Sequence, residues 1–297
     1  MLLKFGKRKI RLTGEDVILG IVNYGSLTLF SLVCVLPFLY ILGISFTADE
    51  ALAQGIPTLI PRQFSVYAYE YAFKNSGLIL RGFFNSVLIT VCGTLLGLTV
   101  MTMCAYALSR KNLPGRKGFL LYVLFAMLIG GGFIPHYLVI KKVLGMSDTY
   151  WALIIPGCYS AWNMIIIRNF FQTIPESLNE SAQIDGANDL RIFVQIVLPL
   201  STPVIAAIGL FVAVGYWNAW MAGMLYVKSD KYPLMLILRI VTENLSGMAT
   251  IEGAGTVPPS ISLQMAVVVI VMVPIMLVYP FLQKYFAKGM MIGSIKG

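Results

Sequence analysis

Six uncharged, apolar runs follow one another along the chain, separated by shorter polar and charged stretches. The runs cover residues 17–48, 82–109, 118–140, 149–167, 200–227 and 261–283. A bilayer core about 30 Å thick requires roughly 20 apolar residues in helical form, and each run reaches or approaches that length. The pattern therefore predicts an all-α, polytopic membrane protein with six transmembrane helices.

Small and helix-breaking residues modify this picture at three places. Pro37 marks a point where the first run could kink, and that run is too long for the apolar core of a signal peptide, so we expect a retained span. The pair Gly93 and Gly97 suits close approach of another helix. Gly130–Gly132 and Pro135 interrupt the third run, which predicts broken helix where protein or a water-filled cavity covers the backbone.

Composition supports a membrane protein and assigns an orientation. Of the 297 residues, 58% are hydrophobic and only 12% are charged, whereas ordinary soluble domains carry about 25% charged residues. The net charge of +9 comes from Lys and Arg beside the apolar runs, which is typical of membrane orientation and not of nucleic-acid binding. Most basic residues fall in segments that share one side, so both termini are expected in the cytoplasm.

This orientation divides the chain into a membrane domain, 17–283, and the segments around it. The expected cytoplasmic parts are residues 1–16, the 110–117 hairpin, 168–199 and the tail 284–297. The expected outer loops are 46–81, whose tyrosines suit either the bilayer interface or an external protein, and 228–260, with room for one short helix.

The sequence lacks the residue patterns of several activities. No Asp, Glu, Lys or Arg interrupts the six runs, which disfavours a carrier driven by intramembrane carboxylates. There is no phosphate-binding loop and no metal-ligand cluster, and His136 is the one histidine. Cys34, Cys92, Cys104 and Cys158 have no metal-ligand spacing. We therefore expect no catalytic residue, metal or cofactor in this chain.

The segment 168–199 is the longest polar stretch between two apolar runs. Thr173 and Glu176 have the spacing of a capping box, and Gly186 suits the end of the helix that would follow. Asn188 or Asp189 can cap a second helix. Its apolar residues recur at spacings of three and four, and they are Leu190, Phe193, Val194 and Val197. The segment therefore predicts two helices joined by a glycine turn.

The spacing within this segment resembles that of a known family. Glu180-Ser181-Ala182, then Gly186 and then Ile196-Val197-Leu198-Pro199 resemble the EAA loop of ABC-importer permeases, with Ser181 where the pattern has alanine. The resemblance implies a MetI-like, type I importer fold in which this loop contacts a cytoplasmic ATPase. The residues it assigns to coupling are Glu180, Ser181, Ala182, Asp185, Gly186 and Pro199.

The C-terminal sequence from Tyr279 to Gly297 resembles that of carbohydrate-importer permeases of the MalG-like kind, in a subgroup associated with complex or uronic-acid-containing saccharides. This implies a bacterial inner-membrane protein that pairs with a second permease, two ATP-binding subunits holding ATP and Mg²⁺, and an extracytoplasmic solute-binding protein. It also implies that the tail reaches the ATPases, although a solvated basic tail is the alternative. The tail residues concerned are Gly289, Gly293, Lys296 and Gly297.

Aromatic rings stack on sugar faces, so five residues are candidates for the substrate pathway: Asn85, Tyr216, Trp217, Asn218 and Trp220. Packing between helices would explain them equally well. The predicted function is a permease subunit of an ATP-driven importer of oligosaccharides. The alternatives are an ABC permease for a non-sugar solute, or an ATPase-independent carrier or membrane scaffold.

Overall fold

The computed structural model describes the chain except for residues 1–3, 6–7, 10–13, 56–58, 76, 244–248, 252–254, 258–259 and 295–297. Contacts divide the chain into two units. The first comprises residues 1–70 with 260–269, and the second comprises residues 71–259 with 270–297.

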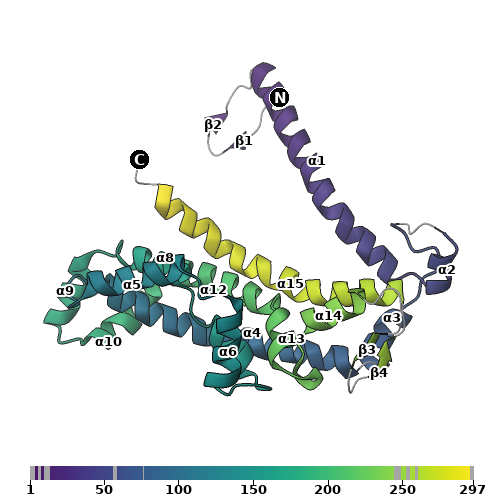
Figure 1. Cartoon of the computed structure of the whole chain (residues 1–297). Coiled ribbons are helices and arrows are strands. Elements are labelled where there is room, and N and C mark those ends of the chain that lie inside the picture. Colours follow the sequence, from purple (N-terminus) through teal and green to yellow (C-terminus); the bar gives the residue numbers. More distant parts are fainter. Residues whose placement is uncertain are drawn as a thin grey trace. The chain divides into compact units, whose positions relative to one another are not determined.

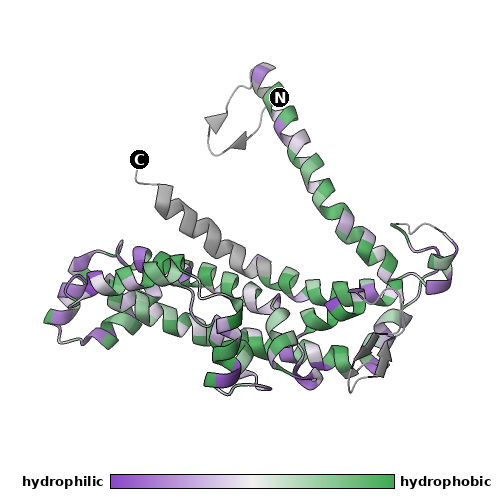
Figure 2. Ribbon diagram, viewed as in Figure 1, coloured by the Kyte–Doolittle hydropathy of each residue, from purple (hydrophilic) through white to green (hydrophobic). Residues whose placement is uncertain are grey.

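The first unit contains one long helix and several short elements. The elements are β1 (Lys4–Phe5), β2 (Arg8–Lys9), α1 (Gly14–Ser45), α2 (Asp49–Ala53), α3 (Tyr67–Glu70) and the start of α15 (Ile261–Ser294). Helix α1 runs without interruption through Pro37, and apolar side chains are exposed along its length, among them Phe30 at 68%. A helix so apolar suits a lipid or protein environment (Figures 1 and 2).

Ring stacking and side-chain hydrogen bonds hold the segment after α1 in place. The rings of Phe46 and Phe64 stack with centroids 5.5 Å apart. The carboxylate of Asp49 accepts hydrogen bonds from the Ser260 hydroxyl (2.6 Å) and the Ser262 N–H (3.3 Å). Because Ser262 lies in the first turn of α15, Asp49 satisfies one of the N–H groups that the helix itself leaves unpaired.

The second unit is built around α4 (Gly77–Ser109), which packs against α8 (Ala161–Phe171) and α12 (Thr202–Trp217) (Figure 1). Its other helices are η1 (Tyr71–Asn75), α5 (Arg116–Leu128), α6 (Phe133–Leu138), η2 (Val139–Val143), α7 (Trp151–Ile154), η3 (Ile155–Gly157), α9 (Glu176–Ile184), α10 (Asp189–Ile192), η4 (Phe193–Val197), α11 (Leu198–Leu200), α13 (Met221–Tyr226), η5 (Ser229–Lys231) and α14 (Leu234–Glu243). Strands β3 (Ala249–Ile251) and β4 (Gly255–Val257) form an antiparallel hairpin.

Two glycines of α4 permit the close packing of this unit. A Cβ atom on Gly93 would lie 2.6 Å from the ring of Tyr216 on α12, and one on Gly97 would lie 3.1 Å from the carbonyl oxygen of Cys158. The close approach predicted from this glycine pair is confirmed. The partners are an aromatic side chain and the backbone before α8.

Among the described residues, three helices are long and apolar enough to cross a membrane: Ile18–Ser45, Gly77–Ser109 and Ile261–Val278. Two further candidates are bent pairs, one of 109° over Arg116–Leu128 and Phe133–Val143 and one of 81° over Asp189–Leu200 and Thr202–Trp217. The break predicted at Gly130–Gly132 is thus confirmed. The total of six spans stays a prediction.

One expectation about helix continuity was wrong. The run 149–167 is divided into α7, η3 and α8, and α8 begins after Ser160. The regular helix is interrupted because Pro156 has no N–H to donate to the preceding turn. The last helix continues past residue 283 to Ser294. Gly289 and Gly293 therefore lie in α15, while Lys296 and Gly297 lie outside the described residues. In the loop 228–260, the short helix we expected is α14.

Candidate functional site

Helices α9 and α10 form the predicted pair joined by a glycine turn. Gly186 adopts a φ of +78°, a left-handed conformation that glycine takes at little cost. Its N–H donates to Gln183 O (3.0 Å) and the next N–H, of Ala187, donates to Ala182 O (2.9 Å), which is the Schellman pattern of helix ends. The side chain of Asn188 then accepts from the Arg191 N–H at 2.8 Å. The glycine stop and the asparagine cap are confirmed.

The start of α9 differs from the prediction. Its N-cap is Pro175, without a side-chain cap, and the Thr173 hydroxyl donates to Phe170 O at 2.8 Å. The capping box predicted from Thr173 and Glu176 is therefore wrong, because the threonine closes the preceding turn of α8. Glu176 pairs instead with Lys111, Oε2 to Nζ, at 2.5 Å.

The apolar face predicted for the second helix is only half correct. Phe193 and Val197 are buried, but Leu190 is 65% exposed and Val194 is 51% exposed. The cause is the π-helical turn Phe193–Val197, which widens the helix and shifts the angular position of the residues around it. Ile192, which the periodicity did not select, is fully buried.

Ionic and aromatic contacts attach this hairpin, residues 175–190, to the end of α4. Arg110 pairs with Asp189 at 3.3 Å, and the hydroxyl of Tyr106 donates to the Asp189 carbonyl at 3.2 Å. The ring of Tyr106 packs against Phe193 with centroids 4.9 Å apart. Together with the Lys111–Glu176 pair, these contacts attach the hairpin to the C-terminal end of α4.

The residues assigned to coupling lie mainly on the exposed side of α9. Glu180, Ser181, Asp185 and Gly186 are exposed, while Ala182 packs against the core. Pro199 is exposed on α11. Ile184, between the polar residues of α9, is 87% exposed. This end of the unit is largely hydrophilic (Figure 2).

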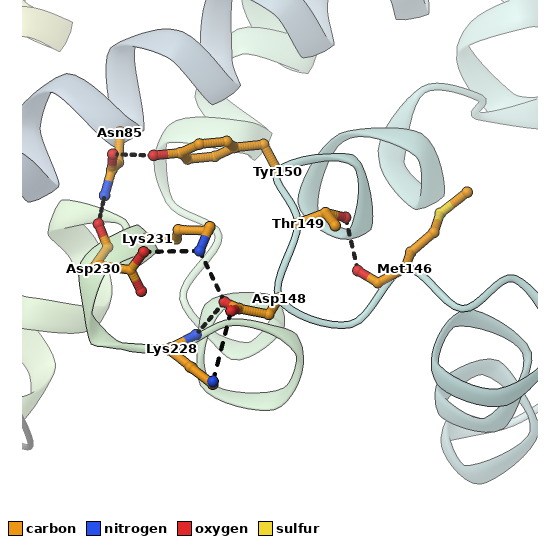
Figure 3. Close-up of polar contacts among 8 residues, drawn as sticks. All are labelled: Asn85, Met146, Asp148, Thr149, Tyr150, Lys228, Asp230 and Lys231. Carbon is orange, nitrogen blue, oxygen red and sulfur yellow. Dashed lines mark hydrogen bonds and ion pairs between the residues drawn. The ribbon is translucent and has the colours of Figure 1, made fainter.

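Asn85 belongs to a polar cluster that joins three segments (Figure 3). Its Nδ2 donates to the carbonyls of Asp230 and Tyr232, each at 3.1 Å, and its Oδ1 accepts from the Tyr150 hydroxyl at 2.8 Å. The amide therefore fastens the start of α4 to residues far along the chain. Sequence reasoning missed this role because the partners are mostly backbone atoms, which no residue pattern reveals.

Asp148 is the ionic centre of the same cluster (Figure 3). Its backbone has a φ of +58°, and its carboxylate accepts from the Lys228 N–H (3.2 Å) and from Lys231 Nζ (3.1 Å). These hydrogen bonds lower the pKa of Asp148. The pairings of Lys231 with Asp230 and Asp148 raise the pKa of its ammonium group.

A cavity of about 500 Å³ lies among the broken helices of the second unit. It is lined by Phe133, His136, Ala152, Leu153, Pro156, Gly157, Ser160, Asn163, Phe211, Val212, Gly215, Tyr216, Ala219, Met221, Ala222, Leu225 and Tyr226. Of the five pathway candidates, the structure brings only Tyr216 to this cavity. We refer to it as the break cavity.

The other pathway candidates make different contacts. Trp217 is buried, and its indole N–H donates to Val271 O at 3.0 Å. Trp220 lies under the guanidinium of Arg239, with 3.5 Å between Cζ and the ring centroid. Asn218 is exposed at the C-terminal cap of α12. Among the residues that the structure describes, no group of three His, Cys, Asp or Glu side chains could hold a metal ion.

Comparison with known proteins identifies the class of protein that this fold and hairpin define. Residues 16–292 match the family described as "Binding-protein-dependent transport system inner membrane component". The chain belongs to this family of ABC-importer permeases. The permeases are membrane components without catalytic activity, and ATP is hydrolysed by separate subunits of the importer.

Individual relatives agree with this assignment. The chain is 48% identical to "Polygalacturonan/rhamnogalacturonan transport system permease protein YtcP" of Bacillus subtilis (strain 168), over 92% of this chain and 96% of that protein. A bacterial ABC transporter "involved in the import of the acidic polysaccharide alginate" matches with a TM-score of 0.84 at 32% identity, covering 93% and 99% of the two chains. A second alginate-transporter chain, solved "in complex with alginate pentasaccharide-bound periplasmic protein", matches at 17% identity and a TM-score of 0.59, over 90% and 94%. The fold is that of the MetI-type permeases.

Proposed function

We propose that this chain forms part of the passage through which an importer moves oligosaccharides, and that the hairpin 175–190 transmits the motion of cytoplasmic ATP-binding subunits. The membership of the family makes the chain a permease that works with a solute-binding protein. The resemblance to EAA loops supports assigning energy coupling to this hairpin.

The exposed side chain of Ile184 is the observation that supports the proposed coupling site. The isoleucine side chain is 87% exposed among polar residues, so it does not gain the favourable free energy of burial. A protein partner that covers the side chain would supply that free energy. The Schellman turn orders the end of α9, and the Tyr106 hydrogen bond and the two ion pairs join the hairpin to α4, so we expect a displacement at Ile184 to reach α4. Rigid-body transmission of this kind is how packed helices amplify a small displacement.

The assembly we propose contains a second homologous permease, two subunits that bind ATP and Mg²⁺, and an extracytoplasmic binding protein, within a bacterial inner membrane. The hairpin and both termini would lie in the cytoplasm. The helical end of α15, which includes Gly289 and Gly293, would extend toward the ATPases with Lys296 and Gly297 beyond it.

The solutes we propose are oligosaccharides that contain uronic acids. Two of the matched proteins with more than 30% identity to this chain carry names that refer to polygalacturonan or rhamnogalacturonan and to alginate. These polymers share acidic sugar units, although they come from different sources. The common chemistry is therefore a short, anionic oligosaccharide.

A transport assay on the assembled importer tests the proposal. Membrane vesicles containing the wild-type transporter, its binding protein and internal ATP should accumulate trigalacturonate. The Ile184→Ser variant should lose uptake and co-purify less ATP-binding subunit, because it removes an exposed contact without disturbing the core. Leu144→Ser is the matched control, since Leu144 is 49% exposed away from the hairpin. Wild-type uptake without any ATP-binding subunit would overturn the coupling proposal.

A further inference from the structure

Two of the interruptions of regular helix in this part of the chain meet at one cavity. Phe133 and His136 come from the segment after the Gly130–Gly132 break, and Pro156, Gly157 and Ser160 come from the break before α8; all five line the break cavity. Irregular backbone at membrane depth requires cover by protein or a polar cavity. In transporters, interrupted segments in different parts of the chain commonly form the substrate site.

We infer that the break cavity holds one or more sugar units of the substrate, so that this subunit contacts the saccharide directly. The inference rests on the proposed function, and it adds a binding site on this chain. The volume of about 500 Å³ falls within the roughly 300–1,000 Å³ typical of small-molecule sites.

The cavity is lined by both aromatic and polar side chains, which complement the apolar faces and the hydroxyl groups of a pyranose ring. Phe133 and Phe211 line the cavity and are 56% and 58% exposed, and aromatic rings stack on the apolar C–H face of a sugar as they do on other flat ligands. The lining also includes three residues with polar side chains, His136, Ser160 and Asn163. A few polar groups in an apolar pocket fix the orientation of a ligand.

One aromatic wall is held firmly in place. The hydroxyl of Tyr216 donates to the carbonyl of Ile154 at 2.6 Å, and its ring lies against Gly93 and Gly157, where added Cβ atoms would be 2.6 and 3.0 Å away. Both glycines leave room for this ring orientation. A preorganised wall binds a ligand without an entropic cost for ordering its side chain.

The described residues that line the cavity include no Asp, Glu, Lys or Arg. Sugar units would therefore be recognised through ring faces and hydroxyl groups, and carboxylates would gain no charge-assisted hydrogen bond here. This cavity would accept an acidic sugar and its neutral ester alike. Selection for negative charge would then take place on another subunit.

Gly215 provides a way to fill the cavity without disturbing the fold. It lines the cavity, lies in α12, and a Cβ atom built on it meets no atom within 4 Å. We expect Gly215→Leu to lower trigalacturonate uptake by at least about tenfold, because excess side-chain volume excludes a ligand from a fitted pocket. ATP hydrolysis stimulated by the binding protein should persist, since the hairpin is unchanged.

Gly118→Leu is the matched control, because Gly118 is helical, exposed and also free of atoms within 4 Å, and it should transport normally. Wild-type uptake with normal uptake by Gly215→Leu would overturn the inference about the cavity alone. Loss of both uptake and stimulated ATP hydrolysis in Gly215→Leu would indicate a damaged fold, and occupancy of the cavity is then decided by the cysteine labelling of the same position. If wild-type vesicles accumulate no saccharide, the proposed function itself fails.

A labelling experiment tests the recognition mode on the same residue. In the assembled transporter with the four native cysteines of this chain replaced by serine, Gly215→Cys should react with a neutral thiol reagent. Trigalacturonate and its methyl ester should slow this reaction equally, within about threefold, since the described residues that line the cavity include no Asp, Glu, Lys or Arg. Protection by neither saccharide would contradict occupancy, and protection by the free acid alone would contradict neutral recognition.

Discussion

The ring of Tyr216 occupies the space that a side chain on Gly93 would need, since a Cβ atom at Gly93 would lie 2.6 Å from the ring. This contact joins α12 to α4 at the centre of the second unit. The hydroxyl of the same tyrosine reaches Ile154 at 2.6 Å. One side chain therefore connects three segments, and the adjoining break cavity takes its shape from this arrangement.

Gly93→Ala should destabilise the protein. The added methyl group must displace the Tyr216 ring or the α4 backbone, and overpacking of this kind costs about 1–3 kcal/mol. Thermal unfolding of the purified chain in detergent measures the effect. Gly118→Ala is the control, because it has open space and should be neutral or slightly stabilising. Equal unfolding temperatures for Gly93→Ala and wild type would contradict this packing.

Gly186→Val should disturb the coupling hairpin while leaving the membrane helices intact. A β-branched residue at a φ of +78° is strained by about 1–2 kcal/mol or more, so the turn between α9 and α10 would change direction. We expect normal membrane insertion with greatly reduced uptake. Gly186→Asn should retain most activity, since asparagine tolerates the left-handed conformation. Full uptake by the valine variant would show that the left-handed conformation of Gly186 is not required for coupling.

The polar cluster around Asp148 should be insensitive to pH across the physiological range. The pKa of Asp148 is lowered by its hydrogen bonds with Lys228 and Lys231, so its contribution to stability is present above the usual value of about 3.9 and is lost only as the pH falls below it. The raised pKa of Lys231 implies that its contribution is present below its usual value of about 10.4 and is lost as the pH rises through the higher folded value.

Asp148→Asn tests this directly, because asparagine keeps the left-handed backbone and removes the charge. Its unfolding temperature should be lower than that of wild type by a constant amount between about pH 5 and 9, and the difference should diminish below about pH 4. A difference that varies strongly near neutral pH would show that another titrating group controls the cluster.

Features that depend on neighbouring residues were predictable from the sequence. Gly186 as a helix stop, Asn188 as a cap and the break at Gly130–Gly132 all follow from local backbone chemistry. The glycine pair Gly93 and Gly97 also indicated close packing. In each case the residue type itself limits the conformation, so no knowledge of distant partners was required.

Features that depend on distant partners were not predictable in the same way. Asn85 was interpreted as a pathway residue, yet its amide binds backbone carbonyls 145 and 147 positions away. The capping box failed because Thr173 bonds within the preceding turn, and the apolar face of the second helix failed because a π-helical turn changed its phase. The break cavity required tertiary structure, since its walls come from separate helices.

The location of the hairpin relative to the membrane is the central claim. In a chain whose four native cysteines are replaced by serine, Gln183→Cys places a thiol on the exposed side of α9. A membrane-impermeant maleimide should label it in inside-out vesicles and leave it unlabelled in intact cells. Labelling of Gln183→Cys in intact cells would place the hairpin on the outer surface, where no cytoplasmic ATPase could reach it, and would contradict the account.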